Sequence, residues 1–231
     1  MDRSNCSINK LAFVHVPKTA GMSLHTELKK YFGKKKSIRF GNQEERFLFL
    51  SMESEQLKNY DYVGGHISFE ELSKKGIHYP TISVVREPVR RLISLQHYIT
   101  NSDLKEHQGV SFNSIELLLQ DIFSQKAFNM QCWHLCGRPS FELAVQSIRK
   151  NNIFVVPLEY YQDLVDTLSG LLGTPLSNLR RNVTQYKNSV DVDELKHDLF
   201  DPIIGEDKKL FSYVKQNYES LKQEFIQSLA R

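Results

Sequence analysis

Apolar residues along the chain gather in short continuous runs, and each run precedes a segment whose apolar residues repeat with helical spacing. Residues 10–16 form the first such run, which ends at Pro17, and residues 21–32 have the helical spacing. The same order recurs at residues 82–99 and 153–172. These segments predict three strands, each followed by a helix.

A further apolar run, YDYVGGH at residues 60–66, predicts a fourth strand. The predicted strands are continuously apolar instead of alternating with polar residues, a pattern typical of parallel strands that are covered on both faces. We therefore expect an α/β fold, in which one domain spans residues 1–231 and a central, mainly parallel sheet is flanked by helices.

The stretches outside these units are predicted to be helical. Residues 111–150, approximately, resemble a helical insertion of about two helices. Residues 191–229, approximately, predict two C-terminal helices separated by Pro202 and Gly205. No linker, repeat or low-complexity tract divides the chain, so no domain boundary is predicted.

Composition narrows the class of protein without identifying it. The chain has 231 residues, of which 40% are hydrophobic and 25% charged, and its formal net charge is +3. This content supports a folded core and is too weakly basic to predict a nucleic-acid partner. No apolar run approaches the ~18 residues of a membrane span, and the first ten residues lack the hydrophobic core of a secretory signal. We therefore expect a cytoplasmic protein.

Three cysteines, Cys6, Cys132 and Cys136, cannot all pair within one chain. Cys132 and Cys136 lie at helical spacing around His134, but this set lacks a fourth ligand and the usual spacing of a zinc site. Reduced, structural thiols are the better interpretation, and no metal site is predicted.

The sequence PKTAGMS at residues 17–23 lies between the first predicted strand and its helix. Such a turn presents backbone N–H groups beside the positive end of the helix dipole, which suits a phosphate or sulfate group. Gly21 allows the backbone to approach the anion. Thr19 and Ser23 add hydroxyl donors, and Lys18 adds a positive charge. The alternative is a well-capped helix start without a ligand.

This turn differs from the common P-loop of ATP-binding proteins. The P-loop places its lysine after the second glycine, whereas Lys18 precedes Gly21. No acidic residue at a neighbouring strand end offers a ligand for magnesium. The turn therefore predicts a nucleotide whose chemistry needs no metal, and it disfavours an ATP-dependent kinase.

A second polar turn follows the next long strand. Arg86 ends that strand, and Ser94 lies about two helical turns further on, so both could bind a second phosphate group. The alternative is that Arg86, Arg90 and Arg91 form a solvated helix face with Glu87 as a local partner.

Two anion-binding turns at successive strand ends are much stronger evidence for a bound anionic ligand than one turn alone. Because ligands of parallel sheets bind at the carboxyl ends of the strands, we expect Lys18, His66 and Arg86 to converge on one edge of the sheet.

With these two turns in place, the sequence resembles the sulfotransferases that use 3′-phosphoadenosine 5′-phosphosulfate. PKTAGMS is similar to their 5′-phosphosulfate loop, and SVVREPVRRLIS to their 3′-phosphate motif. The segments GGHISF, NMQCWHLCG and NLRRNVTQYK are most similar to the branch that contains uronyl and heparan sulfate 2-O-sulfotransferases. The resemblance runs from about Leu11 to the last helix, and it implies a P-loop-like nucleotide-binding architecture.

The resemblance also implies a binding site. The turn residues that would surround the 5′-phosphosulfate are Lys18, Thr19, Ala20, Gly21, Met22 and Ser23. Arg86 and Ser94 would hold the 3′-phosphate. The residues that would close over the nucleotide are Arg180, Asn182 and Thr184. The family usually has a hydroxyl residue where Met22 stands, so Met22 would contribute its backbone N–H alone. The product would be adenosine 3′,5′-bisphosphate, and no metal is expected.

Two residues are candidates for the chemistry. Lys18 could stabilise the charge that builds on the departing phosphate. His66 has an ordinary pKa in the range of a general base and matches the catalytic histidine of the family within its GHxxF pattern. The alternatives are that His66 is a structural turn residue, or that His15 takes the role of base, although packing or orientation suits His15 better.

The acceptor is expected to be a hydroxyl-bearing glycan or small molecule. A basic cluster could hold an anionic glycan, but a solvated helix end is the favoured interpretation of its residues, which are Lys29, Lys30, Lys34, Lys35, Lys36 and Arg39. A different class of function remains open, a non-catalytic nucleotide-binding or regulatory module that has kept the phosphate turns.

Overall fold

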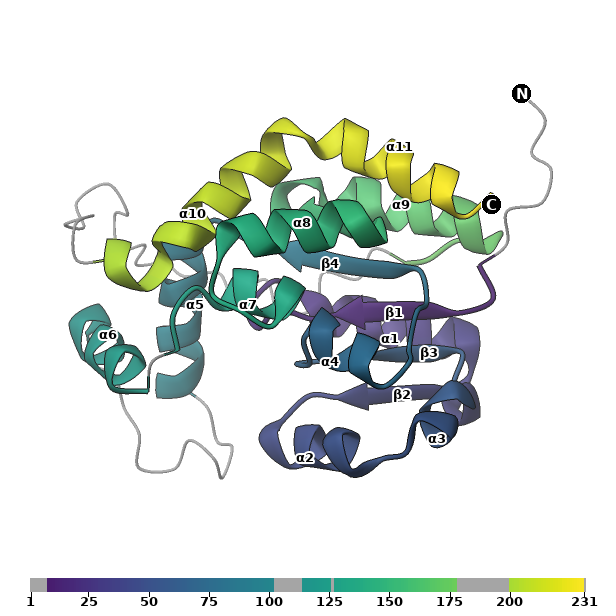
Figure 1. The fold of residues 1–231 in the computed structure, drawn as a ribbon, viewed down its shortest axis with the longest axis horizontal. Helices are drawn as coiled ribbons and strands as arrows, with labels where there is room; N and C mark the ends of the chain where they lie inside the picture. The colour runs from purple at the N-terminus through teal and green to yellow at the C-terminus, as the bar shows by residue number, and fades with distance from the viewer. Residues whose placement is uncertain (1–7, 102–113, 126, 178–199, 231) are drawn as a thin grey trace.

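The computed structural model describes residues 8–101, 114–125, 127–177 and 200–230. Its centre is one sheet of five parallel strands in the order β2-β3-β1-β4-β5 (Figure 1). The strands are β1 (Leu11–Val14), β2 (Ser37–Phe40), β3 (Tyr62–Gly65), β4 (Thr81–Val85) and β5 (Phe154–Pro157). The predicted α/β class and the parallel sheet are confirmed.

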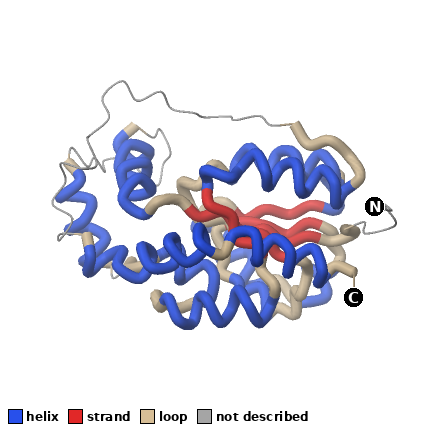
Figure 2. The backbone as a smooth tube through the Cα atoms, turned by 90° about the horizontal axis from the view of Figure 1, so that it is seen from above, coloured by secondary structure: helices blue, strands red, loops and turns tan. Residues whose placement is uncertain are grey.

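Helices cover both faces of this sheet, as Figure 2 shows. The longer ones are α1 (Gly21–Phe32), α2 (Gln43–Ser51), α5 (Pro88–Thr100), α6 (Ile115–Ser124), α8 (Phe141–Asn151), α9 (Tyr161–Leu172), α10 (Asp201–Gln216) and α11 (Tyr218–Ser228). The shorter ones are α3 (Ser54–Lys58), α4 (Phe69–Lys74), α7 (Met130–Cys136) and the single 3₁₀ turns η1 (Lys34–Lys36) and η3 (Leu158–Tyr160).

Adjacent apolar residues of β1, β3, β4 and β5 enter different hydrophobic clusters, because side chains alternate between the faces of a sheet. Phe13 packs with α1 and α9, whereas its neighbours Ala12 and Val14 pack with residues of α4, α7, α8 and α10. Both faces are therefore buried, which explains the continuously apolar strands of the sequence.

The strand β2 was not predicted. Its four residues follow a run of three lysines, and its centre, Ile38 and Arg39, is only partly buried because β2 is an edge strand. Such a short segment lacks the continuous apolar pattern that identifies the other strands.

The helical regions differ from the prediction in two details. Three described helices, α6, α7 and α8, lie between α5 and β5, where about two were expected. The break in the C-terminal helical region falls at Asn217, not at Pro202 and Gly205. Pro202 lies in the first turn of α10, where a missing N–H costs no helical hydrogen bond. An added Cβ at Gly205 would meet nothing within 4 Å, and the helix continues through it.

The two described cysteines behave as structural thiols. Cys132 is buried, and the Cys136 thiol donates to backbone carbonyls of its own region. Within the described residues, no group of three or more His, Cys, Asp or Glu side chains could hold a metal ion. Cys6 lies outside the described residues. None of the described helices is both long and apolar enough to cross a membrane, and a cytoplasmic location stays a prediction.

Candidate active site

The turn between β1 and α1 has an uncommon backbone. Lys18 (φ 73°) and Ala20 (φ 62°) both adopt the left-handed conformation, which costs about 1–2 kcal/mol for a residue other than glycine. The Thr19 hydroxyl stabilises the turn by donating to the Val16 carbonyl at 2.8 Å. Left-handed residues in a turn bring successive N–H groups together into an anion-binding concavity. Strain of this kind is typical of functional turns.

The side chains of this turn contribute less to an anion site than the sequence indicated. Thr19 is fully buried and its hydroxyl proton is taken by Val16, so its side chain shapes the turn. Met22 is 44% exposed, and Ser23 is buried inside α1. Since the first N–H groups of a helix have no intrahelical acceptor, the start of α1 offers a ligand mainly backbone donors.

The Lys18 ammonium lies 3.9 Å from the centre of the Tyr98 ring on α5. Burial, followed by the neighbouring Arg86 charge, lowers the pKa of Lys18 to about 8. Lys18 is therefore still mostly protonated at pH 7. Among the described residues its ammonium forms no ion pair, which favours the binding of an anion.

The second turn meets the first. Arg86 follows β4, and its Nη1 donates to the Lys18 carbonyl at 3.3 Å. The strand register places Val14 of β1 opposite Gly65 of β3 and Ser83 of β4, so the turns that follow these strands share one edge. Lys18 and Arg86 converge, as the sequence predicts.

Sequence reasoning missed the residue that orients this second turn. Gln131 of α7 binds the Arg86 backbone on both sides, accepting from its N–H at 2.9 Å and donating to its carbonyl at 3.0 Å. Asp207 of α10 in turn accepts from the N–H groups of Gln131 and Cys132, at 3.1 and 2.9 Å. The predicted helical insertion therefore supports the site through α7.

The three arginines of this region do not form one solvated face. Arg90 is exposed, whereas Arg91 is 3% exposed and interacts electrostatically with the buried Asp207. Glu87 accepts from the N–H groups of Val89 and Arg90, at 3.1 and 2.7 Å, and so serves as the N-cap of α5. Arg86 alone of the three follows the strand end directly.

His66 lies directly after β3, and its backbone N–H donates to the Phe40 carbonyl at 2.7 Å. Its ring centre is 4.7 Å from that of His15, and its ring nitrogens bind no described residue. Burial, then the charge of Arg39, lowers the pKa of His66 to about 4, although Glu45 acts in the opposite direction. The ring is neutral at pH 7 and can accept a proton.

Three buried residues, His15, His25 and Tyr62, form a hydrogen-bonded cluster behind His66. His15 at the end of β1 and His25 of α1 are both buried, and Nε2 of His25 lies 3.2 Å from Nδ1 of His15. The Tyr62 hydroxyl of β3 is hydrogen-bonded to Nδ1 of His25. Burial lowers the pKa of both histidines well below 6.5, so both are neutral. No pattern in the sequence indicates this cluster beyond His15, because its members come from separate parts of the chain.

Arg39 is a further residue of this edge that the sequence assigned elsewhere. It lies on β2 opposite Gly64, and its charge lowers the pKa of His25 and His66. Its Nε is buried and has no hydrogen-bond partner among the described residues. The prediction that Arg39 belongs to the basic cluster of the first helix end is therefore wrong.

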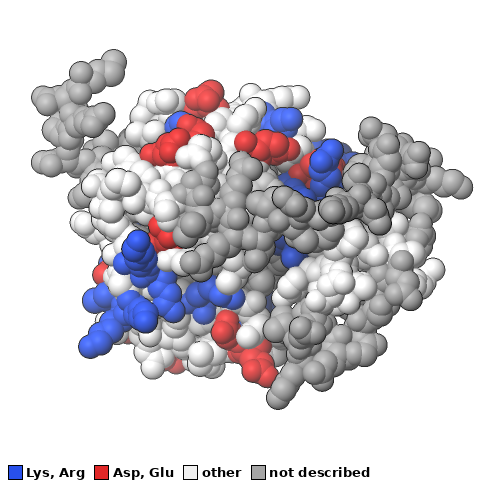
Figure 3. Space-filling view, turned by 180° about the vertical axis from the view of Figure 1, so that it is seen from behind, with Lys and Arg blue, Asp and Glu red and all other residues white. Residues whose placement is uncertain are grey.

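The other residues of that cluster are exposed on the last turn of α1 and on η1, and Figure 3 shows Lys and Arg side chains gathering there. Since α1 has 12 residues, this group lies about 18 Å along the helix from the turn between β1 and α1. Its position agrees with a solvated helix end.

Some predicted site residues remain without a described contact. Ser94 lies on α5, partly exposed, and no described residue hydrogen-bonds to its hydroxyl. Arg180, Asn182 and Thr184 lie outside the described residues.

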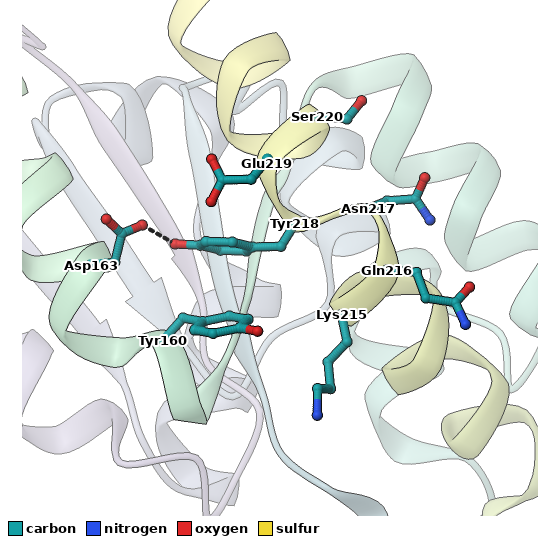
Figure 4. Close-up of a pocket in the computed structure, with 8 residues that line it drawn as sticks. All are labelled: Tyr160, Asp163, Lys215, Gln216, Asn217, Tyr218, Glu219 and Ser220. Carbon is teal, nitrogen blue, oxygen red and sulfur yellow. Dashed lines mark hydrogen bonds between the residues drawn. The ribbon is translucent and has the colours of Figure 1, made fainter.

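A hollow of about 360 Å³ lies elsewhere, between α9 and the turn from α10 to α11 (Figure 4). Tyr160 and Tyr218 stack there with ring centres 4.6 Å apart, and the Tyr218 hydroxyl donates to Asp163. Lys18, His66 and Arg86 do not line this hollow, so it is separate from the candidate site.

Comparisons with known proteins add little. No protein-family model matches this chain, and no curated protein matches it. Among solved structures, mouse sulfotransferase SULT7A1 complexed with PAP is similar at 16% sequence identity and a TM-score of 0.43. The alignment covers 74% of this chain and 61% of that protein, which is less than two thirds of its length. At this level of similarity, the function has to be inferred from the chain's own residues.

Proposed function

We propose that this protein is a sulfotransferase that moves a sulfuryl group from 3′-phosphoadenosine 5′-phosphosulfate to a hydroxyl group. The observation that supports the proposal most is the hydrogen bond between the two anion turns, Arg86 to the Lys18 carbonyl, beside the neutral ring of His66. One ligand that carries anionic groups at two ends fits such a pair of turns.

In this proposal the 5′-phosphosulfate binds the N–H groups at the start of α1, with Lys18 beside it. Arg86 and Ser94 bind the 3′-phosphate. Gln131 holds the Arg86 backbone in place, which restricts where the guanidinium can reach. No metal is needed for this binding, because the cationic side chains and the helix dipole supply the positive potential.

The transfer step needs a base and a stabilised leaving group. The acceptor oxygen forms a bond to sulfur while the bond between sulfur and the bridging oxygen breaks, and that electron pair stays on the departing 5′-phosphate. Lys18 stabilises the charge that develops there. A ring nitrogen of His66 takes the acceptor's proton. A bound polyanion offsets the charges of Arg39 and Lys18, which raises the pKa of His66 toward the range of an effective base.

We infer a carbohydrate or small-molecule hydroxyl as the acceptor, from the similarity of GGHISF and NMQCWHLCG to the uronyl and heparan sulfate 2-O-sulfotransferase branch. A non-catalytic module that binds the nucleotide without transfer is the alternative. The low pKa of His66 in the unliganded protein favours that alternative, since a base of pKa about 4 is weak.

Transfer of ³⁵S-labelled sulfate from the donor to a panel of glycans, phenols and alcohols tests the proposal. We expect a labelled product whose rate falls about 10²–10⁴-fold in His66→Ala, the usual loss on removing a general base. Lys18→Ala should lower turnover more than donor binding. Matched controls are His78→Ala and Lys29→Ala, since both residues are exposed and neither follows a strand end at the site edge. Donor binding without transfer to any acceptor would support the non-catalytic module instead.

A further inference from the structure

The polar aromatic cluster behind the phosphate turn forms a continuous hydrogen-bonded chain. It runs from the Tyr62 hydroxyl to Nδ1 of His25, and from Nε2 of His25 to Nδ1 of His15 over 3.2 Å. All three residues are buried: Tyr62 lies on β3, His25 on α1, and His15 directly after β1. Every member is neutral, because burial opposes the charged form of each side chain.

Only two directions of proton donation are possible in this chain. If Tyr62 donates to His25, then His25 carries its proton on Nε2 and donates it to His15, which carries its own proton on Nε2. If every bond runs in reverse, the Tyr62 proton has no acceptor among the described residues, and Nε2 of His15 is a bare lone pair. Each direction leaves one donor without a described acceptor, Nε2–H of His15 in the first and the Tyr62 O–H in the second. Tyr62 is 1% exposed, whereas Nε2 of His15 is not among the fully buried unpartnered nitrogens of the described residues. Because a sealed donor without an acceptor costs free energy, the first direction is favoured: it places the unpaired donor where a ligand or water can reach it.

The charge of Arg39 favours the same direction. It favours the negative form of the Tyr62 oxygen and disfavours a positive His25. A Tyr62 oxygen that donates its proton gains negative character, and the positive charge of Arg39 stabilises that arrangement. A phenol is also a better donor toward imidazole than an acceptor from it.

The His15 end of this hydrogen-bonded chain faces the start of α1. A Cβ added to Gly21 would lie 2.3 Å from both Nε2 and Cδ2 of His15, so this ring edge occupies the space that a side chain would take. Nε2 of His15 has no hydrogen-bond partner among the described residues. It is also absent from the fully buried unpartnered nitrogens of those residues, so a ligand can reach it. The end of the chain therefore faces the place where the phosphate turn receives its anion.

A second glycine, Gly64, leaves room for the Tyr62 end of the hydrogen-bonded chain. A Cβ added to Gly64 would lie 2.7 Å from the Tyr62 hydroxyl oxygen and 2.9 Å from Cε1 of His25. The ring of His15 packs against those of Phe13 and His66, whose centres are 5.2 and 4.7 Å away. The chain is thus fixed by packing as well as by hydrogen bonds.

We propose that His15 binds the anion at the start of α1 through a fixed Nε2–H donor, and that Tyr62 and His25 are positioning residues that set its tautomer. The inference rests on the proposed function for the identity of that anion, the 5′-phosphosulfate of the donor or the 5′-phosphate of the product. His15 would then add a neutral donor to the cationic Lys18, and His66 would remain the separate base.

Long-range ¹H–¹⁵N NMR correlations of the histidine rings test the tautomer in the unliganded protein, whatever its activity. We expect His15 and His25 both to be neutral and protonated at Nε2 between pH 6 and 8. Protonation at Nδ1 of either ring would overturn the proposal.

Calorimetric titration with adenosine 3′,5′-bisphosphate tests the contact. His15→Leu should weaken binding about tenfold, the smaller loss expected for a hydrogen bond to a charged group. His15→Gln should recover most of that affinity, since its amide can also donate. Tyr62→Phe should weaken binding severalfold and give mixed tautomers at His25, whereas Tyr79→Phe, which removes a hydroxyl bound to the Tyr60 carbonyl, should do neither.

The outcomes separate the two proposals. Binding by the wild-type protein with no loss in His15→Leu would overturn the role of His15 and leave the proposed function intact. Absence of nucleotide binding by the wild-type protein would contradict the proposed function. The titration would then be repeated with sodium sulfate, and a loss of sulfate binding in His15→Leu with recovery in His15→Gln would still support the donor.

Discussion

Replacing Gly21 by alanine should destabilise the protein, although the change adds a good helix former to α1. Gly21 is the first residue of α1 and does not have a positive φ, so the backbone itself tolerates alanine. The added Cβ, however, would lie 2.3 Å from two atoms of the His15 ring, which real Cβ contacts essentially never show. The ring cannot move away easily, because it is hydrogen-bonded to His25 and packed against Phe13 and His66.

The expected magnitude follows from two opposing effects. Overpacking a buried site costs about 1–3 kcal/mol. Alanine gains at most about 1 kcal/mol over glycine inside a helix, and less in the first turn. The free energy of unfolding should therefore fall by about 1–2 kcal/mol in Gly21→Ala.

Urea unfolding followed by circular dichroism measures this change. Gly170→Ala and Gly205→Ala are matched controls, because both glycines are helical and an added Cβ would meet nothing within 4 Å. Each control should gain about 0.5–1 kcal/mol. In a His15→Ala background the clash is absent, so Gly21→Ala should become neutral or stabilising. If Gly21→Ala is as stable as the two controls, the His15 ring does not occupy this space and the reasoning fails.

Three further predictions concern the same edge of the sheet. An anion binds the protonated form of Lys18, whose pKa is about 8, so affinity for adenosine 3′,5′-bisphosphate should be greatest near pH 7 and fall as the pH rises through 8. Lys18→Arg should show no such fall up to about pH 9.5 by calorimetry. Gln131→Leu should lower the free energy of unfolding by about 1–3 kcal/mol, since the N–H and carbonyl of Arg86 both lose their hydrogen-bond partner. An unchanged urea midpoint would refute this role of Gln131. Ala20→Gly should raise the thermal midpoint, since it relieves about 1 kcal/mol of left-handed strain, and a lowered midpoint would contradict that conformation.

Local patterns in the sequence were sufficient for the frame of the fold. Helix α1 spans Gly21–Phe32, the same residues 21–32 that have helical spacing in the sequence. The predicted apolar face of α9 is buried as a whole, at Leu164, Val165, Leu168, Leu171 and Leu172. These features depend on neighbours within a few residues, and the order of residues carries that information directly.

Features that depend on distant parts of the chain were not predicted. Gln131 is an ordinary polar residue in the sequence, and its role exists only because α10 holds α7 beside the end of β4. Arg39 was grouped with lysines near it in sequence, while the sheet places it opposite Gly64. Gly21 was expected to make room for a ligand, and the structure shows that His15 fills its space.

In the proposed function, two neighbouring turns bind opposite ends of one nucleotide. The most direct test of this arrangement compares the affinities of adenosine 3′,5′-bisphosphate and adenosine 5′-monophosphate, measured by calorimetry in the presence of EDTA. The wild-type protein should prefer the bisphosphate by about tenfold or more, as one charge-assisted contact supplies. Arg86→Ala should lose most of that preference, whereas Lys18→Ala should weaken both ligands equally. If neither ligand binds, or if Arg86→Ala weakens the binding of both ligands to the same extent, the two turns do not bind opposite ends of the nucleotide.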